Sequence, residues 1–170
     1  MTLARRLLSV GGEDLLKMTV SFDLPSSTGR RTTEYSGMRC VADYTIARLR
    51  VRWIRGLSFA EPATRILVAN LDNDEILDEV EDSSGFPNVA TVELTCRITP
   101  DVPFAVLAHG DGATVNHARL SESSGWDPPY GDEGLRILSG TMGSTIAGLS
   151  DDDSGLGFDL IVANDFDWEA

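Results

Sequence analysis

Lysine and histidine are scarce in this chain of 170 residues. Lys17 is the only lysine, His109 and His117 are the only histidines, and the formal net charge is −13. Binding to a phosphate backbone needs clustered lysine and arginine, so the composition argues against a nucleic-acid partner. The preference for arginine over lysine has two interpretations. One is a high-GC genome, and the other is a salt-adapted source whose carboxylate-rich surface stays hydrated in brine.

Long apolar runs are also missing. No stretch approaches the roughly 20 apolar residues of a membrane-spanning helix, so we expect no membrane insertion. The first residues, MTLARRLLSVGGEDLL, include basic side chains but only a very short apolar stretch, which makes a poor signal peptide. We therefore expect a soluble chain with nothing that directs export.

The chain has only two cysteines, Cys40 and Cys96, and both lie in segments patterned as strands. Cys96 falls on the apolar face of its strand, which favours a buried free thiol over a disulfide.

Sequence motifs for catalysis are absent. There is no G-x-S-x-G elbow, H-x-x-x-H, C-x-x-C or P-loop. A triad can be drawn from Ser121 or Ser123 with a histidine, but nothing in the spacing supports it. His109 lies at the turn end of an apolar strand, where we expect a satisfied surface imidazole. We therefore predict no catalytic residues and no enzyme.

Acidic clusters raise the question of a metal. Asp72, Asp74 and Asp78 partly match the ligand spacing of an EF-hand loop, but the central glycine is missing and Ser83 stands at the twelfth position. Asp151–Asp153 are consecutive, so their carboxylates converge on one ion only in an unusual turn. We predict solvated turns with no cofactor and no metal, and a structural calcium ion is the alternative.

The central pattern of the chain lies within Ala90–Gly112. Val92, Leu94, Cys96 and Ile98 alternate with polar residues, which indicates a half-buried strand. Pro100 and Asp101 break this run, and Phe104–Ala108 then has the mixed pattern of a strand buried on both faces. We predict a hairpin covered by a second sheet, and so an all-β, antiparallel β-sandwich in a single domain.

Further strands are expected on both sides of this unit. Thr45–Ile54 places Arg48, Arg50 and Arg52 on one face, which is either an anion-binding stripe or, as we favour, a row paired with carboxylates across the sheet. The other predicted strands are Met18–Leu24, Thr64–Leu71, Leu135–Leu138 and Phe158–Val162. Tyr35–Val41 is ambiguous because of Gly37, while Pro25–Arg31 is expected to be a loop and Gly140–Gly148 a mobile connection.

The two ends of the chain are candidates for partner contacts. Within Thr2–Leu16, Leu3, Leu7 and Leu8 share the face of a helix that Gly11 and Gly12 would end. This gives a short N-terminal arm or helix (1–17), a β-sandwich domain (18–163) and an acidic tail (164–170). The arm either docks on a partner or folds back on its own sandwich. Phe166 and Trp168 in the tail alternate, as in a segment that adds to a sheet edge or lies in a neighbour's groove.

The longest irregular loop is Ser121–Gly134. It holds Trp126 and Tyr130, with Asp127 beside the tryptophan. Aromatic side chains on loops suit stacking against sugar rings or contact with proteins, so these residues are a candidate glycan site. The alternative is a tryptophan that covers the end of its own sandwich.

The order of elements from Gly37 to Asn116 resembles the jelly-roll appendage domains of phage tail fibres and spikes. The similar pieces are Tyr44–Val51, Ala63–Glu79 and Val92–Gly112, about half of the chain. The chain departs from the pattern by an extra proline in Pro100–Phe104 and by the absence of the strand's frequent tryptophan. The resemblance implies a jelly roll located in a virion, on a tail fibre, spike or capsid. It also implies an arm for attachment, and loops at one end of the sandwich that contact host glycans.

The leading hypothesis is thus a virion structural protein, a fibre, spike or capsid decoration component. It would form a homo-oligomer or assemble with other virion proteins. The alternatives are a free carbohydrate-binding module and, less favoured, a small hydrolase.

Overall fold

The computed structural model describes residues 2–10, 13–21, 28–30, 34–54, 62–87, 89–110, 116–120, 129–131, 135–152, 155–156 and 159–163. Every regular element in these ranges is a β-strand. The strands are β1 (Thr2–Val10), β2 (Glu13–Ser21), β3 (Thr28–Arg30), β4 (Tyr35–Ala42), β5 (Ile46–Ile54), β6 (Arg65–Asn70), β7 (Ile76–Glu81), β8 (Val89–Ile98), β9 (Phe104–His109), β10 (Asn116–Leu120), β11 (Tyr130–Gly131), β12 (Leu135–Gly143), β13 (Ser150–Asp152), β14 (Gly155–Leu156) and β15 (Asp159–Ala163).

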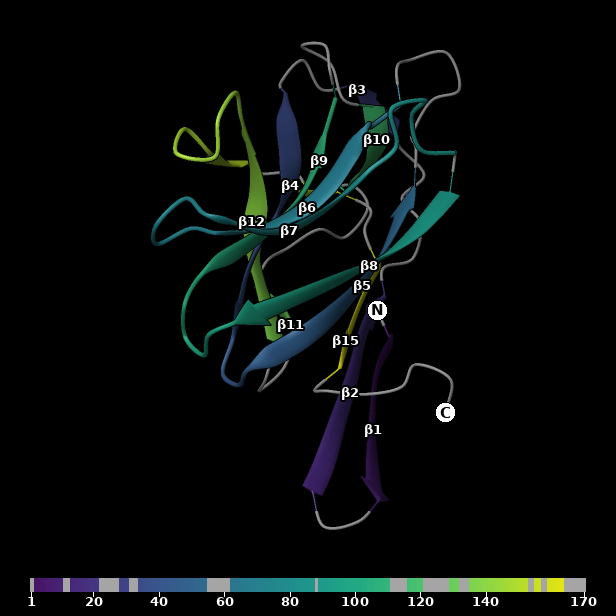
Figure 1. The fold of residues 1–170 in the computed structure, drawn as a ribbon, viewed down its shortest axis with the longest axis vertical. Coiled ribbons are helices and arrows are strands. Elements are labelled where there is room, and N and C mark those ends of the chain that lie inside the picture. Colours follow the sequence, from purple (N-terminus) through teal and green to yellow (C-terminus); the bar gives the residue numbers. More distant parts are fainter. Residues whose placement is uncertain are drawn as a thin grey trace.

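The strands form two large antiparallel sheets and a small one (Figure 1). A five-stranded sheet has the order β1-β2-β15-β5-β8. A seven-stranded sheet has the order β11-β12-β4-β9-β6-β7, with β13 paired to β12, and β14-β10-β3 form the small sheet. The prediction of an all-β, antiparallel sandwich is confirmed. Among the described residues, no helix has the length and apolar character needed to cross a membrane.

The main core lies between the two large sheets. Strand β8 supplies Val92, Leu94, Cys96 and Ile98 to it, and each residue between them is exposed, as the alternation predicted. The other large side chains of this core come from both sheets and from the segment after β7: Met38, Ile46, Leu49, Val51, Ile66, Val68, Phe86, Phe104, Val106, Leu135 and Ile137. Burial of this apolar surface is the main stabilising contribution to such a fold.

Strand β9 is buried along its whole length, which confirms the prediction of burial on both faces. Its predicted hairpin with β8 is wrong. Strand β8 pairs with β5, whereas β9 lies between β4 and β6 in the other sheet. The proline segment is therefore a corner between sheets, where Asp101 has a φ of 61° and its N–H donates to the carbonyl of Ala42 at 2.7 Å. A strand that is buried on both faces, as β9 is, belongs in the centre of a covered sheet. A hairpin at the edge of a sheet would not place β9 there.

The N-terminal segment is a β-hairpin, so the helical expectation for Thr2–Leu16 is wrong. Strand β1 pairs with β2 from Thr2↔Ser21 to Val10↔Glu13, and β2 pairs with β15. The sheet offers backbone partners along a whole strand, and this tertiary pairing overrides a weak local pattern. The expected boundary between arm and domain, at residue 17, falls inside β2.

Two further expectations about loops are corrected. Residues 140–143, expected in a mobile connection, extend β12, and β13 returns antiparallel to them. Residues 28–30, expected in a loop, form β3 and pair with β10. Both corrections have the same cause: glycine and polar residues lower intrinsic strand propensity, but a neighbouring strand supplies the hydrogen bonds that decide the structure.

Gly37 lies in the middle of the ambiguous segment, which is strand β4. A Cβ atom at this position would lie 1.9 Å from the carbonyl oxygen of Val106 in β9. The glycine thus permits a close approach of two backbones in the centre of the sheet.

We predict that Gly37→Ala lowers the free energy of unfolding by about 2–3 kcal/mol, because the obstructing atom belongs to the backbone and cannot rotate away. Gly148→Ala is the control, since its Cβ would first meet the rotatable side-chain oxygen of Thr145, at 2.9 Å. Urea denaturation of both variants measures the difference. Equal stability of the two variants would contradict the argument.

Candidate functional site

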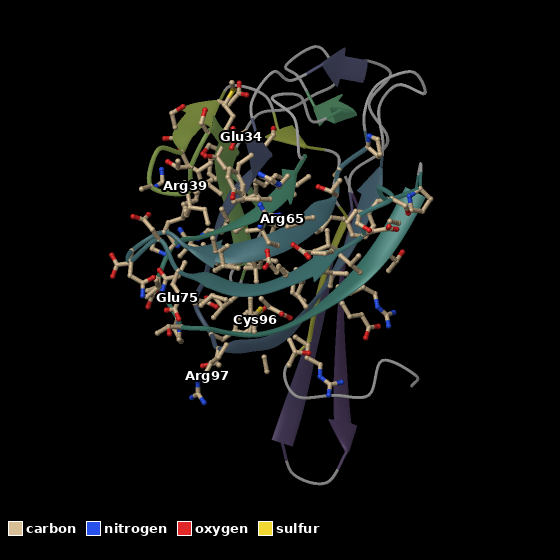
Figure 2. All side chains as sticks on the ribbon, turned by 45° about the horizontal axis from the view of Figure 1, so that its top comes forward. Glu34, Arg39, Arg65, Glu75, Cys96 and Arg97 are labelled. Carbon is tan, nitrogen blue, oxygen red and sulfur yellow. The ribbon has the colours of Figure 1, made fainter. Side chains whose placement is uncertain are left out.

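One row of side chains crosses four strands on the outer face of the seven-stranded sheet. The register pairs Tyr35 of β4 with His109 of β9, His109 with Arg65 of β6, and Arg65 with Glu81 of β7. Glu79 lies on the same face of β7, two residues away. Arg65, which is labelled in Figure 2, is therefore the centre of a polar row that ends at the sheet edge.

The guanidinium of Arg65 contacts both the imidazole and the carboxylates. Its Nη2 lies 3.0 Å from Nδ1 and 3.2 Å from Nε2 of His109. A nitrogen this close to both ring nitrogens lies over the ring face, because in the ring plane it would collide with Cε1. Toward the edge, Nη1 donates to Glu79 Oε2 at 3.3 Å, and Nε lies 3.9 Å from Glu81 Oε1. Arginine suits this place, since it stacks on rings and pairs with carboxylates through one planar group.

His109 is buried, with 7% of its surface exposed, so the expected surface imidazole is wrong. On the side away from Arg65, the ring of Tyr35 lies against it with 4.4 Å between ring centroids and a tilt of 46°. The next residues on this outer face of β6 and β9, Leu67 and Leu107, are register partners and are fully buried. The imidazole thus caps a second, small apolar cluster and is held between a phenol ring and a cation.

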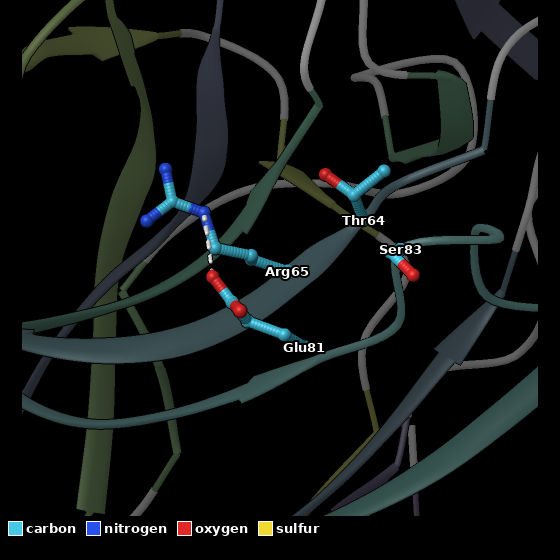
Figure 3. Close-up of a pocket in the computed structure, with 4 residues that line it drawn as sticks. All are labelled: Thr64, Arg65, Glu81 and Ser83. Atoms are coloured by element: carbon cyan, nitrogen blue, oxygen red, sulfur yellow. Dashed lines mark ion pairs between the residues drawn. The ribbon is translucent and has the colours of Figure 1, made fainter.

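A small pocket opens beside this row (Figure 3). Thr64, Arg65, Glu81 and Ser83 line it, and its volume is about 70 Å³. Such a volume holds a few water molecules or a small ion, and it is well below the several hundred Å³ of a pocket that encloses an organic ligand. With a cation and a carboxylate on its wall, the pocket can order water between the ends of β6 and β7.

A second polar cluster on the outer face joins β4, β12 and β13. Asp151 Oδ1 accepts hydrogen bonds from Ser139 Oγ and from Arg39 Nη1, each at 2.9 Å. The Ser139 hydroxyl and the Arg39 guanidinium hold the pKa of Asp151 below its ordinary value of 3.8, against a smaller opposing effect of burial. This cluster secures β13, which leads from the segment whose Ile146 and Leu149 pack on the outer apolar cluster.

Both cysteines are buried free thiols, as predicted. Burial raises the pKa of the Cys40 thiol well above its ordinary value of 9.0. It raises the pKa of Cys96 to about 12, and the nearby carboxylate of Asp78 adds to the effect. Since the thiolate is the reactive form, neither residue has the character of a nucleophile in the folded chain.

The acidic segment after β6 forms an exposed hairpin turn, as expected. Asn70 and Asn73 side-chain oxygens accept the backbone N–H groups of Asp72 and Glu75, in the manner of Asx turns. Asp78 instead bridges the two large sheets, because its Oδ2 accepts the N–H of Thr95 in β8 at 2.6 Å. In the described ranges, no group of three or more histidine, cysteine, aspartate or glutamate side chains is arranged to hold a metal.

The arginine row of β5 has at least one carboxylate across the sheet, as favoured. Arg50 is the register partner of Glu93 in β8, and its Nε donates to Glu93 Oε1 at 3.0 Å. In the same strand pair, Arg48 and Arg52 stand opposite Thr95 and Thr91, and on its other side Arg52 is the register partner of Asp159 in β15.

The predicted ligand and partner residues are distributed as follows. Six of the residues named from the sequence lie outside the described part of the chain: Ser121, Ser123, Trp126, Asp127, Phe166 and Trp168. Tyr130 begins β11 and His117 lies in β10, but neither side chain belongs to the described part. Leu3, Leu7 and Leu8 lie in β1, where Leu3 and Leu7 share one face and Leu8 is on the other. The glycan site therefore stays a prediction.

The sequence offered little sign of the Arg65 row. Arg65 stands at the start of an apolar strand, Tyr35 in an ambiguous segment, and 44 residues separate Arg65 from His109. Only the register of four strands brings them together.

A scan against protein-family models finds none that matches this chain, and a search of the curated proteins finds no matching sequence.

We predict that Arg65→Met lowers the free energy of unfolding by about 1–3 kcal/mol, because Glu79 and Glu81 lose their shared cation and His109 loses a ring contact. Arg97→Met is the control, since Arg97 is exposed on β8. Thermal unfolding followed by circular dichroism measures both. If the Arg65 variant is as stable as the Arg97 variant, the contacts of Arg65 with the two carboxylates and the imidazole do not stabilise the fold.

We also predict a pH-dependent contribution from Asp151. Its folded-state pKa is lowered, so its stabilising effect is present above about pH 4 and is lost as the pH falls through the folded-state value. Asp151→Asn should therefore be less stable than the parent near neutral pH, and this difference should shrink in acid. Ser139→Ala should show a weaker form of the same dependence. Denaturant titrations at several pH values test this, and a constant difference would argue against it.

Proposed function

We propose that the chain is a structural protein of a virion, a fibre, spike or capsid decoration component, that assembles through its β1–β2 hairpin. One observation supports this most directly. Strand β15 pairs only with Lys17–Val20 of β2, so the first part of β2 pairs, in the described residues, with β1 alone. Figure 1 shows the hairpin extending away from the sandwich.

The distal part of this hairpin carries a pair of leucines on each face, followed toward the turn by the pairs Ser9–Asp14 and Val10–Glu13. Leu7 is the register partner of Leu16, and Leu8 is the partner of Leu15. Because successive residues of a strand point to opposite faces, each face of the ribbon carries one leucine pair. An isolated two-stranded ribbon is marginally stable in water, and one with leucines on both faces gains stability when another surface covers it. An attachment device has these properties.

The resemblance of Gly37–Asn116 to jelly-roll appendage domains supports the virion setting. In such an assembly the sandwich is the displayed body and the hairpin is the attachment point. Loops at one end of the sandwich then contact host glycans, with Trp126, Asp127 and Tyr130 as the proposed contact residues. The partners are copies of this chain and other virion proteins.

We predict that the full chain is multimeric in solution and that replacing Leu7 and Leu16 with serine makes it monomeric. This change removes the leucine pair from one face of the distal ribbon and leaves the register of β2 with β15 intact. Light scattering measures the mass. A chain that starts at Lys17, which keeps every residue of β2 that pairs with β15, should also be monomeric.

The control replaces Ala4 and Thr19 with serine, a register pair in the part of the hairpin that has β15 beside it. It should remain multimeric. If the full chain and the chain starting at Lys17 are both monomers, assembly through the hairpin is refuted. A glycan screen with Trp126→Ala then tests the carbohydrate-binding alternative.

A further inference from the structure

The outer face of the five-stranded sheet collects basic residues from distant parts of the sequence. Arg6 of β1 is the register partner of Lys17 of β2, Lys17 is the partner of Ala163 of β15, and Ala163 is the partner of Arg48 of β5. Register partners stand on the same face of a sheet. One line across four strands therefore carries three cationic residues, Arg6, Lys17 and Arg48, with one alanine between them.

This face as a whole has more basic than acidic residues, although the chain has a net charge of −13. By strand alternation and register, its basic residues are Arg6, Lys17, Arg48, Arg50, Arg52 and Arg97, and its acidic residues are Glu13, Glu93 and Asp159. Glu93 pairs with Arg50. Like charges directly opposite on neighbouring strands destabilise a sheet, so the Arg6–Lys17 pair favours an anionic surface placed against it.

A matching anionic surface exists on the same molecule. From Ile66 to Cys96 the chain has no lysine or arginine, and most of its carboxylates there lie in the β6–β7 hairpin. In the turn, Asp72, Asp74 and Glu75 are all exposed. Figure 2 shows Glu75 at the rim of the molecule. This turn belongs to the seven-stranded sheet, whereas the basic face belongs to the five-stranded one.

We propose that the outer face of the five-stranded sheet docks on the β6–β7 hairpin of a second copy of this chain. The inference deepens the proposed function, on which it rests, by naming one partner and both contact surfaces. The two surfaces differ, so the contact is heterologous, and repetition closes a ring or extends a filament according to the rotation between copies. Electrostatic complementarity fixes which surfaces meet and accelerates the encounter, while the net charge opposes other contacts.

Two charge-reversal variants of the full chain test the contact. One carries Arg6→Glu with Lys17→Glu on the basic face, and the other carries Asp72→Lys with Glu75→Lys in the exposed turn. Asp74 is left unchanged because its φ of 60° disfavours most other residues. Arg136→Glu, an exposed position on β12, is the control for a change of net charge alone. Circular dichroism confirms folding, and the turn variant keeps the test valid if the strand variant does not fold.

Sedimentation at about 0.02 M and about 0.5 M salt measures the association. The parent and the Arg136 variant should associate, less strongly at high salt, and each double variant alone should associate at least about tenfold more weakly. An equal mixture of the two double variants should associate again, because the unchanged turn of one meets the unchanged basic face of the other and the two reversed surfaces carry opposite charges.

The other outcomes each decide against the contact. Association of both double variants at the parent's strength overturns it, as does a mixture that stays monomeric. If assembly is lost with the Leu7 and Leu16 serine variant but not with the charge variants, the hairpin function stands and this inference falls. A monomeric parent that binds heparin through Arg6 and Lys17 overturns it in favour of a polyanionic ligand.

Discussion

Burial of β9 on both faces is the constraint on which the larger sheet depends. Its inward residues complete the core between the sheets, and its outward residues, Ala105 and Leu107, need a separate cover. The segment after β12 provides part of that cover with Ile146 and Leu149, and Asp151 secures the strand that follows. Gly37 also serves the placement of β9, because it allows β4 to pack closely beside β9 in the centre of the sheet.

The Arg65 row is the polar boundary of this outer apolar cluster. The imidazole of His109 ends the buried strand, and Arg65 connects it to the solvated carboxylates of β7. At the other side of β7, Asp78 accepts the backbone N–H of Thr95 and so joins the free edges of the two sheets. A side chain that occupies an edge donor in this way also limits strand addition at that corner. Among the described strands, β1 is a long sheet edge without acidic residues, and it lies in the hairpin proposed for assembly.

Local alternation predicted strands well and pairings poorly. The burial of Val92, Leu94, Cys96 and Ile98 followed from period two alone, because one face of β8 is solvated. The pairing partner of β8 did not follow from this alternation, because a proline turn suits a hairpin and a corner between sheets equally. The Arg65 row, the Asp78 bridge and the basic face all depend on register between segments far apart in the sequence. A one-residue slip would move each of them to the other face.

The net charge of −13 bears on how copies of this chain meet. Two bodies of the same sign repel over about a Debye length, so most orientations of approach are disfavoured. An orientation that places Arg6, Lys17 and Arg48 against carboxylates reverses that sign locally. Repulsion between the other surfaces weakens every competing contact, while the contact with matched charges is retained. In the proposed assembly, the acidic composition would contribute specificity, and the leucine pairs of the hairpin would contribute the binding energy.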